Sequence, residues 1–400
     1  MAKSNSTNKE KIEYLLSRNV EEVIDHKHLE AALLSGKKLR IKHGVDPTGE
    51  KIHIGRAISL WKLREFQDLG HKIVLIIGDF TAQIGDPSDK LAKRPFLTAA
   101  QVQKNLESYL PQVGKILDLK KVEVHYNSEW LSKLNFRETA ELAETFTVNQ
   151  MLRRHNFRER WDKGEEISVR EFLYPVMQGY DSVMVKANVE LGGTDQLFNL
   201  MAGREIQKHY GQKSQDIVIT KMLIGTDGRK MSTSWGNVIN INDPADEMYG
   251  KVMSARDDSI VEYFKLATDV PQNQISNYEK ILKQEERNPR DIKSTLAFEI
   301  VKRYHGESSA KKSAENFERM FSKKEVSGVL PELKLKQRKI SLLELVISGV
   351  GGSKSEVRRL ILAGAVELNG AIKKDPNEDI EIRGGEVLKI GKRRFFKVKI

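Results

Sequence analysis

Two short segments of the sequence carry side chains that suit the binding of phosphate groups. The first, His53-Ile54-Gly55-Arg56, lies between a predicted strand and a predicted helix, where backbone amides at a helix N-terminus attract anions. The second, Asp227–Ser234 (DGRKMSTS), is a glycine turn followed by a cation and three hydroxyls. Either segment alone also fits a helix cap or a solvated loop. About 180 residues apart and both flanked by α/β patterns, they together indicate a nucleotide site.

A third group of polar residues lies between these two segments. Tyr174, Gln178 and Asp181 follow the spacing i, i+4, i+7, which places them on one face of a predicted helix. A carboxylate and a carboxamide on such a face can hold a phenol hydroxyl and an ammonium group, although a polar surface stripe would have the same spacing. In the segment LGGTDQ that follows, Asp195 could bind a ribose, and Asp86 follows a strand end, where open α/β sheets bind ligands.

The elements that must position these residues begin with a strand–helix–strand unit. A strand over residues 39–45, a helix over 56–69 ending at Gly70, and a buried strand over 71–77 predict a parallel sheet with a right-handed crossover. Predicted helix precedes this unit over Lys9–Ser35. We predict three domains: an α/β domain over 1–242 with a helical insert at about 97–170, a helical domain over 243–335, and a small basic α+β domain over 340–400. The charged stretch 323–339 is predicted to be a linker.

Composition excludes several classes of protein. The 400 residues are 39% hydrophobic and 31% charged, a globular mixture rather than a disordered one. There is no cysteine, which excludes disulfides, thiolate metal sites and cysteine nucleophiles, and the nine histidines form no HExxH pair. The polar N-terminus and the short aliphatic run Ile73–Ile77 predict a cytoplasmic protein without a membrane span. The net charge of +11 favours a polyanionic partner.

The pair of phosphate segments resembles the two signature sequences of class I aminoacyl-tRNA synthetases, HIGH and KMSKS. The match is HIGR at residues 53–56 and KMSTS at residues 230–234, called here the first and second signatures. The stretches YPVMQGYDS and ELGGTDQ between them resemble those of bacterial tyrosyl-tRNA synthetases, and the resemblance extends from about Lys38 to Ile400. It implies a Rossmann-like catalytic domain with a helical insert, followed by an α-helical domain and an S4-like domain.

The resemblance also implies roles for residues at matching positions. Asp181 would accept a hydrogen bond from the substrate hydroxyl, so that phenylalanine would leave this carboxylate without its partner. Tyr174, Gln178 and Asp86 would bind the ammonium group, and Gln196 would lie near the carboxylate. The implied sets are Thr48, His53, Arg56, Lys230 and Thr233 for catalysis; Lys42, Asp86, Tyr174, Gln178, Asp181 and Gln196 for tyrosine; Gly44, Asp46, Gly55, Gly192, Gly193, Asp195, Met231 and Ser232 for ATP and the adenylate; and Lys90 and Arg94 for pyrophosphate.

The implied reaction has two steps. The tyrosine carboxylate attacks the α-phosphorus of ATP and releases pyrophosphate, and the terminal adenosine of tRNA-Tyr then takes the tyrosyl group. Neither step needs a covalent enzyme intermediate, so catalysis would rest on positioning and on electrostatic stabilisation of the phosphates. Mg²⁺ would accompany ATP, with no metal ligated by the protein itself. The helical insert commonly forms a two-fold contact in this family, which implies a homodimer.

The C-terminal segment is basic and has its own resemblance. Residues 340–400 hold a net charge of +4, over a third of the excess in about a seventh of the chain. A helix carrying Lys354, Arg358 and Arg359, followed by a glycine-bounded strand, resembles the S4-type RNA-binding module. Its contacts are expected to go mostly to phosphates and to weaken with salt. A basic solvated face is the alternative.

Three other functions stay open from the sequence. Tryptophanyl-tRNA synthetases share the overall plan and a stretch similar to YPVxQ, whereas Asp181, GGTDQ and the tail favour tyrosine. A free-standing adenylyltransferase would leave the RNA-like tail unexplained. An RNA-binding paralogue without aminoacylation activity is kept open by three departures from the family pattern: Arg56 for the final His of HIGH, Thr233 for the second Lys of KMSKS, and Asp89 where Gly is usual.

Overall fold

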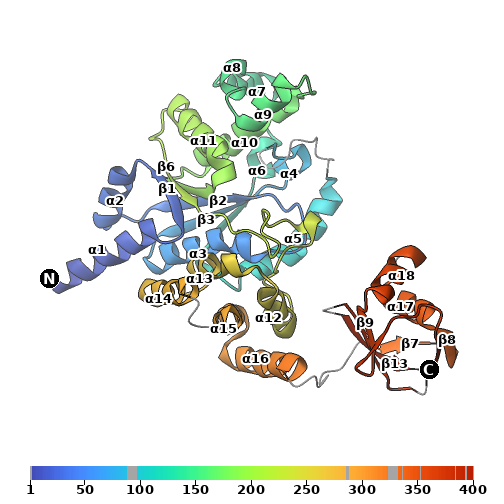
Figure 1. The fold of residues 1–400 in the computed structure, drawn as a ribbon. Coiled ribbons are helices and arrows are strands. Elements are labelled where there is room, and N and C mark those ends of the chain that lie inside the picture. Colours follow the sequence, from blue (N-terminus) through green and yellow to red (C-terminus); the bar gives the residue numbers. More distant parts are fainter. Residues whose placement is uncertain are drawn as a thin grey trace. The chain divides into compact units, whose positions relative to one another are not determined.

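The computed structural model describes residues 2–87, 97–284, 288–322, 332–335, 337–351, 353–382, 384–391 and 394–399. It divides the chain into two compact units, Met1–Phe317 and Glu318–Ile400, and each is described by itself (Figure 1). Among the described residues, no helix combines the length and the apolar character needed to span a bilayer.

A six-stranded sheet forms the centre of the first unit. Its strands, in spatial order, are β1 (Val20–Ile24), β6 (Asp216–Thr220), β5 (Val189–Gly193), β2 (Arg40–Val45), β3 (Lys72–Ile77) and β4 (Glu123–Tyr126). All neighbouring pairs are parallel except β1 with β6, which is antiparallel at the edge. The order reverses between β2 and β5, and the carboxyl ends of strands at such a switch point are where open α/β sheets bind ligands. The fold is therefore the Rossmann-like α/β architecture expected from the sequence.

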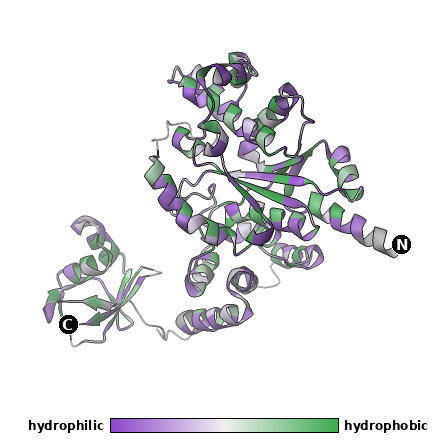
Figure 2. Ribbon diagram, turned by 180° about the vertical axis from the view of Figure 1, so that it is seen from behind, coloured by the Kyte–Doolittle hydropathy of each residue, from purple (hydrophilic) through white to green (hydrophobic). Residues whose placement is uncertain are grey.

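Alternate residues of the central strands pack into separate cores on the two faces of the sheet. Ile73, Leu75 and Ile77 of β3 join the large cluster that includes helix α3 (Ile54–Asp68), whereas Val74 and Ile76 pack with Trp130 and Leu131 on the other face. Figure 1 shows α3 on one side of the sheet, and α10 (Val169–Met184) and α11 (Leu197–His209) on the other. Figure 2 shows hydrophobic residues along the strands that these helices cover.

The single N-terminal helix predicted over Lys9–Ser35 is wrong. The segment forms α1 (Ala2–Ser17), strand β1 and α2 (His26–Leu34). Asn19 and Asp25 flank β1 with φ of 58° and 66°, left-handed conformations that interrupt a helix. The β-branched residues between them pair with β6 and add the antiparallel edge strand.

The segment between β3 and β5 is mostly helical, as its pattern predicts, but it contains strand β4, which the pattern did not reveal. Its helices are α4 (Thr81–Ile84), α5 (Ala99–Val113), η1 (Leu119–Lys121), α6 (Ser128–Leu131), α7 (Phe136–Ala143), α8 (Val148–Met151), α9 (His155–Asp162) and then α10. Helices α5, α7 and α8 each begin with a capping box, in which a Thr or Asn side chain and a Glu or Gln three residues later satisfy the first amides.

Helices also follow the last strand of the sheet, β6. They are η3 (Thr233–Trp235), α12 (Ala245–Met253), η4 (Asp257–Ser259), α13 (Ile260–Ala267), α14 (Gln272–Lys283), α15 (Pro289–His305) and α16 (Glu307–Ser322), with η2 (Thr194–Gln196) earlier, between β5 and α11. Residues of α12, α13 and α15 share the large core with α3, and Trp61 Nε1 donates to Tyr304 Oη at 3.1 Å. Up to Phe317 this helical part belongs to the same compact unit as the sheet, and a separate domain over 243–335 stays a prediction.

The second unit combines two helices with small sheets. Its elements are β7 (Glu332–Lys334), β8 (Lys339–Ser341), α17 (Leu342–Val350), α18 (Lys354–Leu362), β9 (Val366–Leu368), β10 (Ala371–Lys373), β11 (Asp379–Glu381), β12 (Val387–Ile390) and β13 (Arg394–Lys399). Strands β10, β9, β12, β13 and β7 form one sheet, and β11 pairs with β8. Residues 323–331 of the predicted linker lie outside the described residues, and Glu332–Lys334 of that linker is a strand paired with β13.

Candidate active site

The carboxyl ends of β2 and β3 bring Asp46 against helix α10. The Tyr174 hydroxyl donates to Asp46 Oδ2 at 2.8 Å, and Thr81 Oγ1 donates to Asp46 Oδ1 at 2.7 Å. Gly78 ends this turn, where a Cβ would clash with both Asp46 and Thr81. Burial and the Asp46 carboxylate raise the pKa of Tyr174 well above 10, so its hydroxyl keeps its proton. Asp46 is therefore held at the strand end by two donors.

A second set of carboxamides surrounds Asp86. Gln196 Nε2 donates to Asp86 Oδ2 at 2.7 Å, and Asn199 Nδ2 donates to Gln178 Oε1 at 3.1 Å and to Gln196 Oε1 at 3.0 Å. Asn199 Nδ2 also lies 3.5 Å from Asp86 Oδ1. This network joins three residues that the sequence predicted to contact tyrosine, from segments up to 110 positions apart. The structure places them together at the switch between β2 and β5.

Asp181 lies on the same helix but in a more enclosed position. Its side chain is buried, with Trp130 Nε1 donating to Oδ1 at 2.8 Å and Asn127 Nδ2 at 3.4 Å from Oδ2. Burial raises the pKa of Asp181 to about 7, against the lowering effect of Lys42 and of its two hydrogen-bond donors. A carboxyl group that is costly to ionise without a ligand is suited to accept a further donor, as the predicted phenol contact requires.

Lys42 lies on strand β2, and its side chain is fully buried. Its ammonium group donates to the Gln178 carbonyl oxygen, Ser182 Oγ and Glu190 Oε1, each at 2.8 Å. These three bonds use all the donors that an ammonium has. Glu190 also accepts from Gln178 Nε2 at 3.2 Å, which leaves Gln178 Oε1 turned toward Asn199. The pair thus fixes the backbone and amide orientation of Gln178.

We expect Lys42→Met to lower the free energy of unfolding by about 3–5 kcal/mol, because the substitution leaves the buried Glu190 carboxylate without its cation. Urea unfolding measures this directly. Lys283→Met is the matched control, since Lys283 is exposed and pairs with Glu279 on the same helix; its loss should change stability by no more than about 0.5 kcal/mol. Equal, small effects of the two substitutions would contradict this account of the buried pair.

The first signature begins helix α3. His53 is the N-cap residue, and its Nδ1 accepts from the Arg56 amide at 3.3 Å. Its backbone forms a bridge with Asn240, and the Ile54 amide donates to the Ile239 carbonyl oxygen at 2.8 Å. A Cβ on Gly55 would lie 3.3 Å from Met231 Sδ, so the first signature touches the second through this glycine. The structure therefore brings the two distant signatures into contact.

The second signature forms a turn that one carboxamide holds in place. Asn237 Nδ2 donates to Asp227 Oδ1 at 2.8 Å and to the Lys230 carbonyl oxygen at 3.1 Å, and its Oδ1 accepts from the Ser232 amide at 2.8 Å. The hydrogen bond from Asn237 is the largest of the effects that hold the pKa of Asp227 at about 2. Lys230 Nζ lies 3.1 Å from Asp195 Oδ2, so the signature cation sits beside the residue predicted to bind the ribose.

The remaining predicted residues surround this arrangement. Gly44 is the last residue but one of β2 and is exposed, Gly192 and Gly193 end β5, and Thr48 lies in the half-buried loop after Asp46. A Cβ on Gly193 would lie 2.9 Å from Asp195 Oδ1, which explains a glycine there. Arg56 and Thr233 are exposed, and Met231 is buried. Lys90 and Arg94, together with the departure at Asp89, lie outside the described residues.

Several residues that build the site were not found by sequence reasoning. They are Gly78, Thr81, Asn127, Trp130, Arg154, Glu190, Asn199 and Asn237. Asn127 follows β4 directly, so recognising that strand would have placed it at the edge where ligands bind. Glu190 is an acid inside a buried strand, a signal for a buried partner that the sequence offered. The other six residues come from loops and helices, and no hydrophobic periodicity in the sequence indicates that these segments approach the site.

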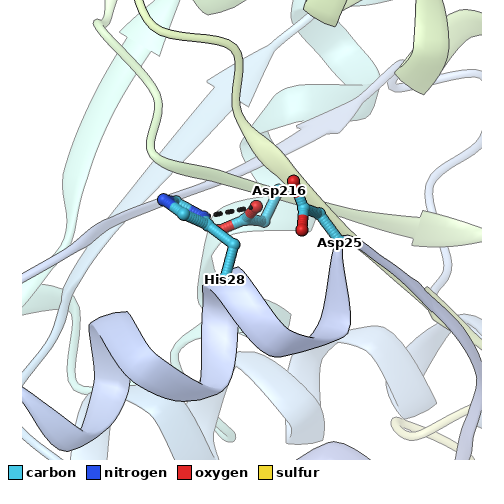
Figure 3. A group of neighbouring side chains, drawn as sticks. All are labelled: Asp25, His28 and Asp216. Atoms are coloured by element: carbon cyan, nitrogen blue, oxygen red, sulfur yellow. Dashed lines mark hydrogen bonds and ion pairs between the residues drawn. The ribbon is translucent and has the colours of Figure 1, made fainter.

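A separate group of side chains lies at the edge of the sheet beside β1. Figure 3 shows Asp25, His28 and Asp216, whose potential ligand atoms all lie within 4.8 Å of one another. His28 Nδ1 is 2.9 Å from both carboxylate oxygens of Asp216, so one ring nitrogen already partners the buried carboxylate. Asp25 is exposed and follows β1 in a left-handed conformation, as the N-cap of α2. The geometry is that of a partly exposed histidine paired with a buried carboxylate, with an exposed acid beside it.

Comparisons with known proteins agree with this geometry. The sequence profile described as tRNA synthetases class I (W and Y) matches residues 34–322, and that of the S4 domain matches residues 344–387. The tyrosine–tRNA ligase of Thermotoga maritima is 46% identical over 385 residues, 96% of each chain. That of Dehalococcoides mccartyi strain CBDB1 is 43% identical over 389 residues, 96% of this chain and 98% of the relative.

Solved structures share the fold at lower identity. Tyrosyl-tRNA synthetase from Archaeoglobus fulgidus, solved with L-tyrosine, aligns with a TM-score of 0.61 at 23% identity, covering 76% of this chain and 99% of that one. A C-terminally truncated mitochondrial tyrosyl-tRNA synthetase from Aspergillus nidulans gives 0.64 at 22% identity, covering 80% and 100%. The chain belongs to the class I tRNA synthetases of the tryptophan and tyrosine group and, within that group, to the tyrosine–tRNA ligases with a C-terminal S4 domain.

Proposed function

We propose that the chain activates L-tyrosine with ATP and then transfers the tyrosyl group to the 3′-terminal adenosine of tRNA-Tyr. A tyrosine carboxylate oxygen attacks the α-phosphorus, the bond from that phosphorus to the bridging oxygen breaks, and pyrophosphate leaves. A ribose hydroxyl of the tRNA then attacks the acyl carbon and AMP leaves. The observation that carries the proposal is the buried Asp181 on the same helix as Tyr174. The partner of Tyr174, Asp46, directly follows strand β2, which precedes the first signature.

Tyrosine would be held at both of its ends. Asp181 would accept a hydrogen bond from the phenol hydroxyl, while Tyr174, Gln178 and Asp86 would bind the ammonium group. Gln196, which contacts Asp86, would lie near the substrate carboxylate. Because all donors of Lys42 are used by protein acceptors, we assign it to supporting Gln178 rather than to direct contact with tyrosine.

ATP would bind where the two signatures meet. The amides at the start of α3 and the side chains of Thr48 and His53 suit its phosphates, and Arg56 retains the positive charge at the signature's last position. Gly192, Gly193 and Asp195 would face the ribose, with Gly44, Gly55, Met231 and Ser232 shaping the turn beside the nucleotide. Lys230 and Thr233 would follow the pyrophosphate as it leaves, joined by Lys90 and Arg94. Mg²⁺ would arrive with ATP as part of the substrate.

ATP–pyrophosphate exchange with tyrosine, tryptophan and phenylalanine in turn tests the activation step. Exchange with tyrosine alone is the expected result. Exchange with tryptophan alone would favour a tryptophanyl-tRNA synthetase, because the YPVMQ stretch is similar in both enzymes. Exchange with none of the three would favour an RNA-binding paralogue without activity.

The second unit would bind the tRNA. Lys354, Arg358 and Arg359 are exposed on α18, whose other face packs Val357 and Ile361 into the core of that unit. The helix begins with a capping box between Ser353 and Glu356, so the three cations are presented on a fixed element.

We expect the triple variant Lys354→Ala, Arg358→Ala, Arg359→Ala to bind tRNA-Tyr more weakly and with less dependence on salt. Each lost phosphate contact should reduce the slope of log K against log salt by about 0.7–0.9. Filter binding across a salt series measures this. A matched control removes three exposed cations of the first unit, Lys120, Lys280 and Lys283. Equal slopes for the two variants would argue that the basic surface of α18 serves only solubility.

We further propose that the protein acts in the cytoplasm as a homodimer whose contact involves the helical insert. Phe136, Val148 and Trp161 of this insert are exposed large hydrophobic residues, a composition suited to a protein interface. The division into an α/β domain over 1–242, a helical anticodon-side domain over 243–335 and an S4-like domain over 340–400 belongs to the same proposal. Sedimentation of the full chain at micromolar concentration tests the dimer.

A further inference from the structure

Arg154 places a buried positive charge inside the site, and neither signature nor helix α10 supplies it. The residue is the N-cap of α9 in the helical insert, and its side chain is 6% exposed. The guanidinium carbon lies 5.5 Å from the ring centroids of both Phe157 and Phe198, so two aromatic rings hold the group in place. An arginine so enclosed keeps its charge and needs acceptors around it.

The described residues offer the Arg154 guanidinium fewer hydrogen-bond acceptors than it has N–H donors. Arg154 Nη2 lies 3.4 Å from Asp86 Oδ1, a long contact, and buried Nη1 has no hydrogen-bond partner within the described part of the chain. Asp86 itself takes the stronger bond from Gln196 at 2.7 Å. Burial lowers the pKa of Arg154, and Asp86 opposes that shift. A buried cation with a vacant donor beside a carboxylate is arranged for an anion that arrives with the substrate.

The chemistry of an amino acid identifies this anion. Its ammonium and carboxylate groups are attached to the same carbon, so a ligand whose ammonium binds Asp86 brings its carboxylate to the neighbouring position. We propose that Nη1 of Arg154 binds the α-carboxylate of tyrosine, and that Asp86 and Arg154 together recognise the zwitterion. This inference rests on the proposed function, in which Asp86 binds the ammonium group. It assigns to the insert a substrate contact in addition to any structural role.

Tyramine separates this role from a structural one, because it keeps the phenol and the ammonium group of tyrosine and lacks the carboxylate. We expect Arg154→Met to weaken tyrosine binding about 10- to 100-fold, the range of one charge-assisted contact. Tyramine binding should stay unchanged or become tighter, because removal of Arg154 also removes a positive charge near the ammonium group. Calorimetric titration of the full chain with each ligand gives both constants.

Arg153→Met is the matched control, since Arg153 precedes Arg154 and is exposed; it should change neither constant. Arg154→Lys keeps the charge and should lose less tyrosine affinity than Arg154→Met, which retains a test if the methionine variant fails to fold. Equal weakening of tyrosine and tyramine in these variants would mean that Arg154 only supports Asp86, and would overturn the inference. A wild-type chain without tyrosine-dependent exchange would instead overturn the proposed function.

Discussion

Lys230→Ala lowers the rate of tyrosine-dependent ATP–pyrophosphate exchange at least about a hundredfold, on the scale of removing one preorganised donor from a transition state. Lys230 is the cation of the second signature, and its ammonium group rests 3.1 Å from Asp195 in a turn that Asn237 holds in place. Charge on the phosphates grows as pyrophosphate leaves, so a cation held nearby stabilises the transition state more than the ground state. The loss should therefore appear in kcat rather than in the KM for tyrosine.

Two further variants serve as controls for the effect of Lys230→Ala. Lys283→Ala removes an exposed cation far along the chain and should leave exchange unchanged. Lys230→Arg keeps the charge with a different shape and should retain part of the rate. Near-normal exchange in Lys230→Ala would refute the assignment of the second signature, whatever the stability of the variant.

The fold could be predicted where hydrophobic periodicity was strong. The buried strand that ends at Ile77 and the helix that ends near Leu69 were both expected within one or two residues, because their apolar residues face a core. Residues 9–35 were misread because a helical pattern continues across β1 on both sides. Only the left-handed conformations at Asn19 and Asp25 break it, and a sequence does not display backbone angles.

The site could be predicted in its residue types but not in its connections. Helical spacing placed Tyr174, Gln178 and Asp181 on one face, yet their partners come from different segments: Asp46 for Tyr174, Asn199 for Gln178 and Trp130 for Asp181. Contacts between residues 21 to 128 positions apart depend on how helices pack over the sheet. Spacing along a single helix carries no information about that packing.

Asp181→Asn should weaken tyrosine activation about a hundredfold or more and reduce the preference for tyrosine over phenylalanine. Asn127 and Trp130 each donate to one oxygen of the Asp181 carboxylate, which keeps further acceptor capacity for a hydrogen bond from the phenol hydroxyl. A site built to hydrogen-bond the phenol hydroxyl of tyrosine rejects phenylalanine, which lacks this hydroxyl. Tyrosyl-tRNA synthetases are themselves the standard example, with a preference for tyrosine over phenylalanine of about 10⁵-fold. Exchange rates with tyrosine and phenylalanine give kcat/KM for both substrates.

The same substitution should have the opposite effect on the stability of the free protein. Burial raises the pKa of Asp181 to about 7, whereas an unfolded aspartate titrates near about 3.9. Between these two values the folded state binds a proton that the unfolded state has lost, so the wild-type free energy of unfolding falls as pH rises. Asparagine has no such titration. The stability of Asp181→Asn relative to wild type should therefore increase from pH 4 to pH 7 and then level off.

Thermal unfolding of both proteins without ligand, at half-unit steps of pH, follows this difference. Asp79→Asn is a matched control, because the Asp79 carboxylate also accepts hydrogen bonds, from the Phe80 and Ser128 amides, but is partly exposed. A difference between Asp181→Asn and wild type that is constant across pH would mean that Asp181 is ionised throughout. If Asp181→Asn lowers the rate of tyrosine activation and raises the stability at pH 8, the Asp181 carboxylate serves substrate binding. Its burial then lowers the stability of the free protein.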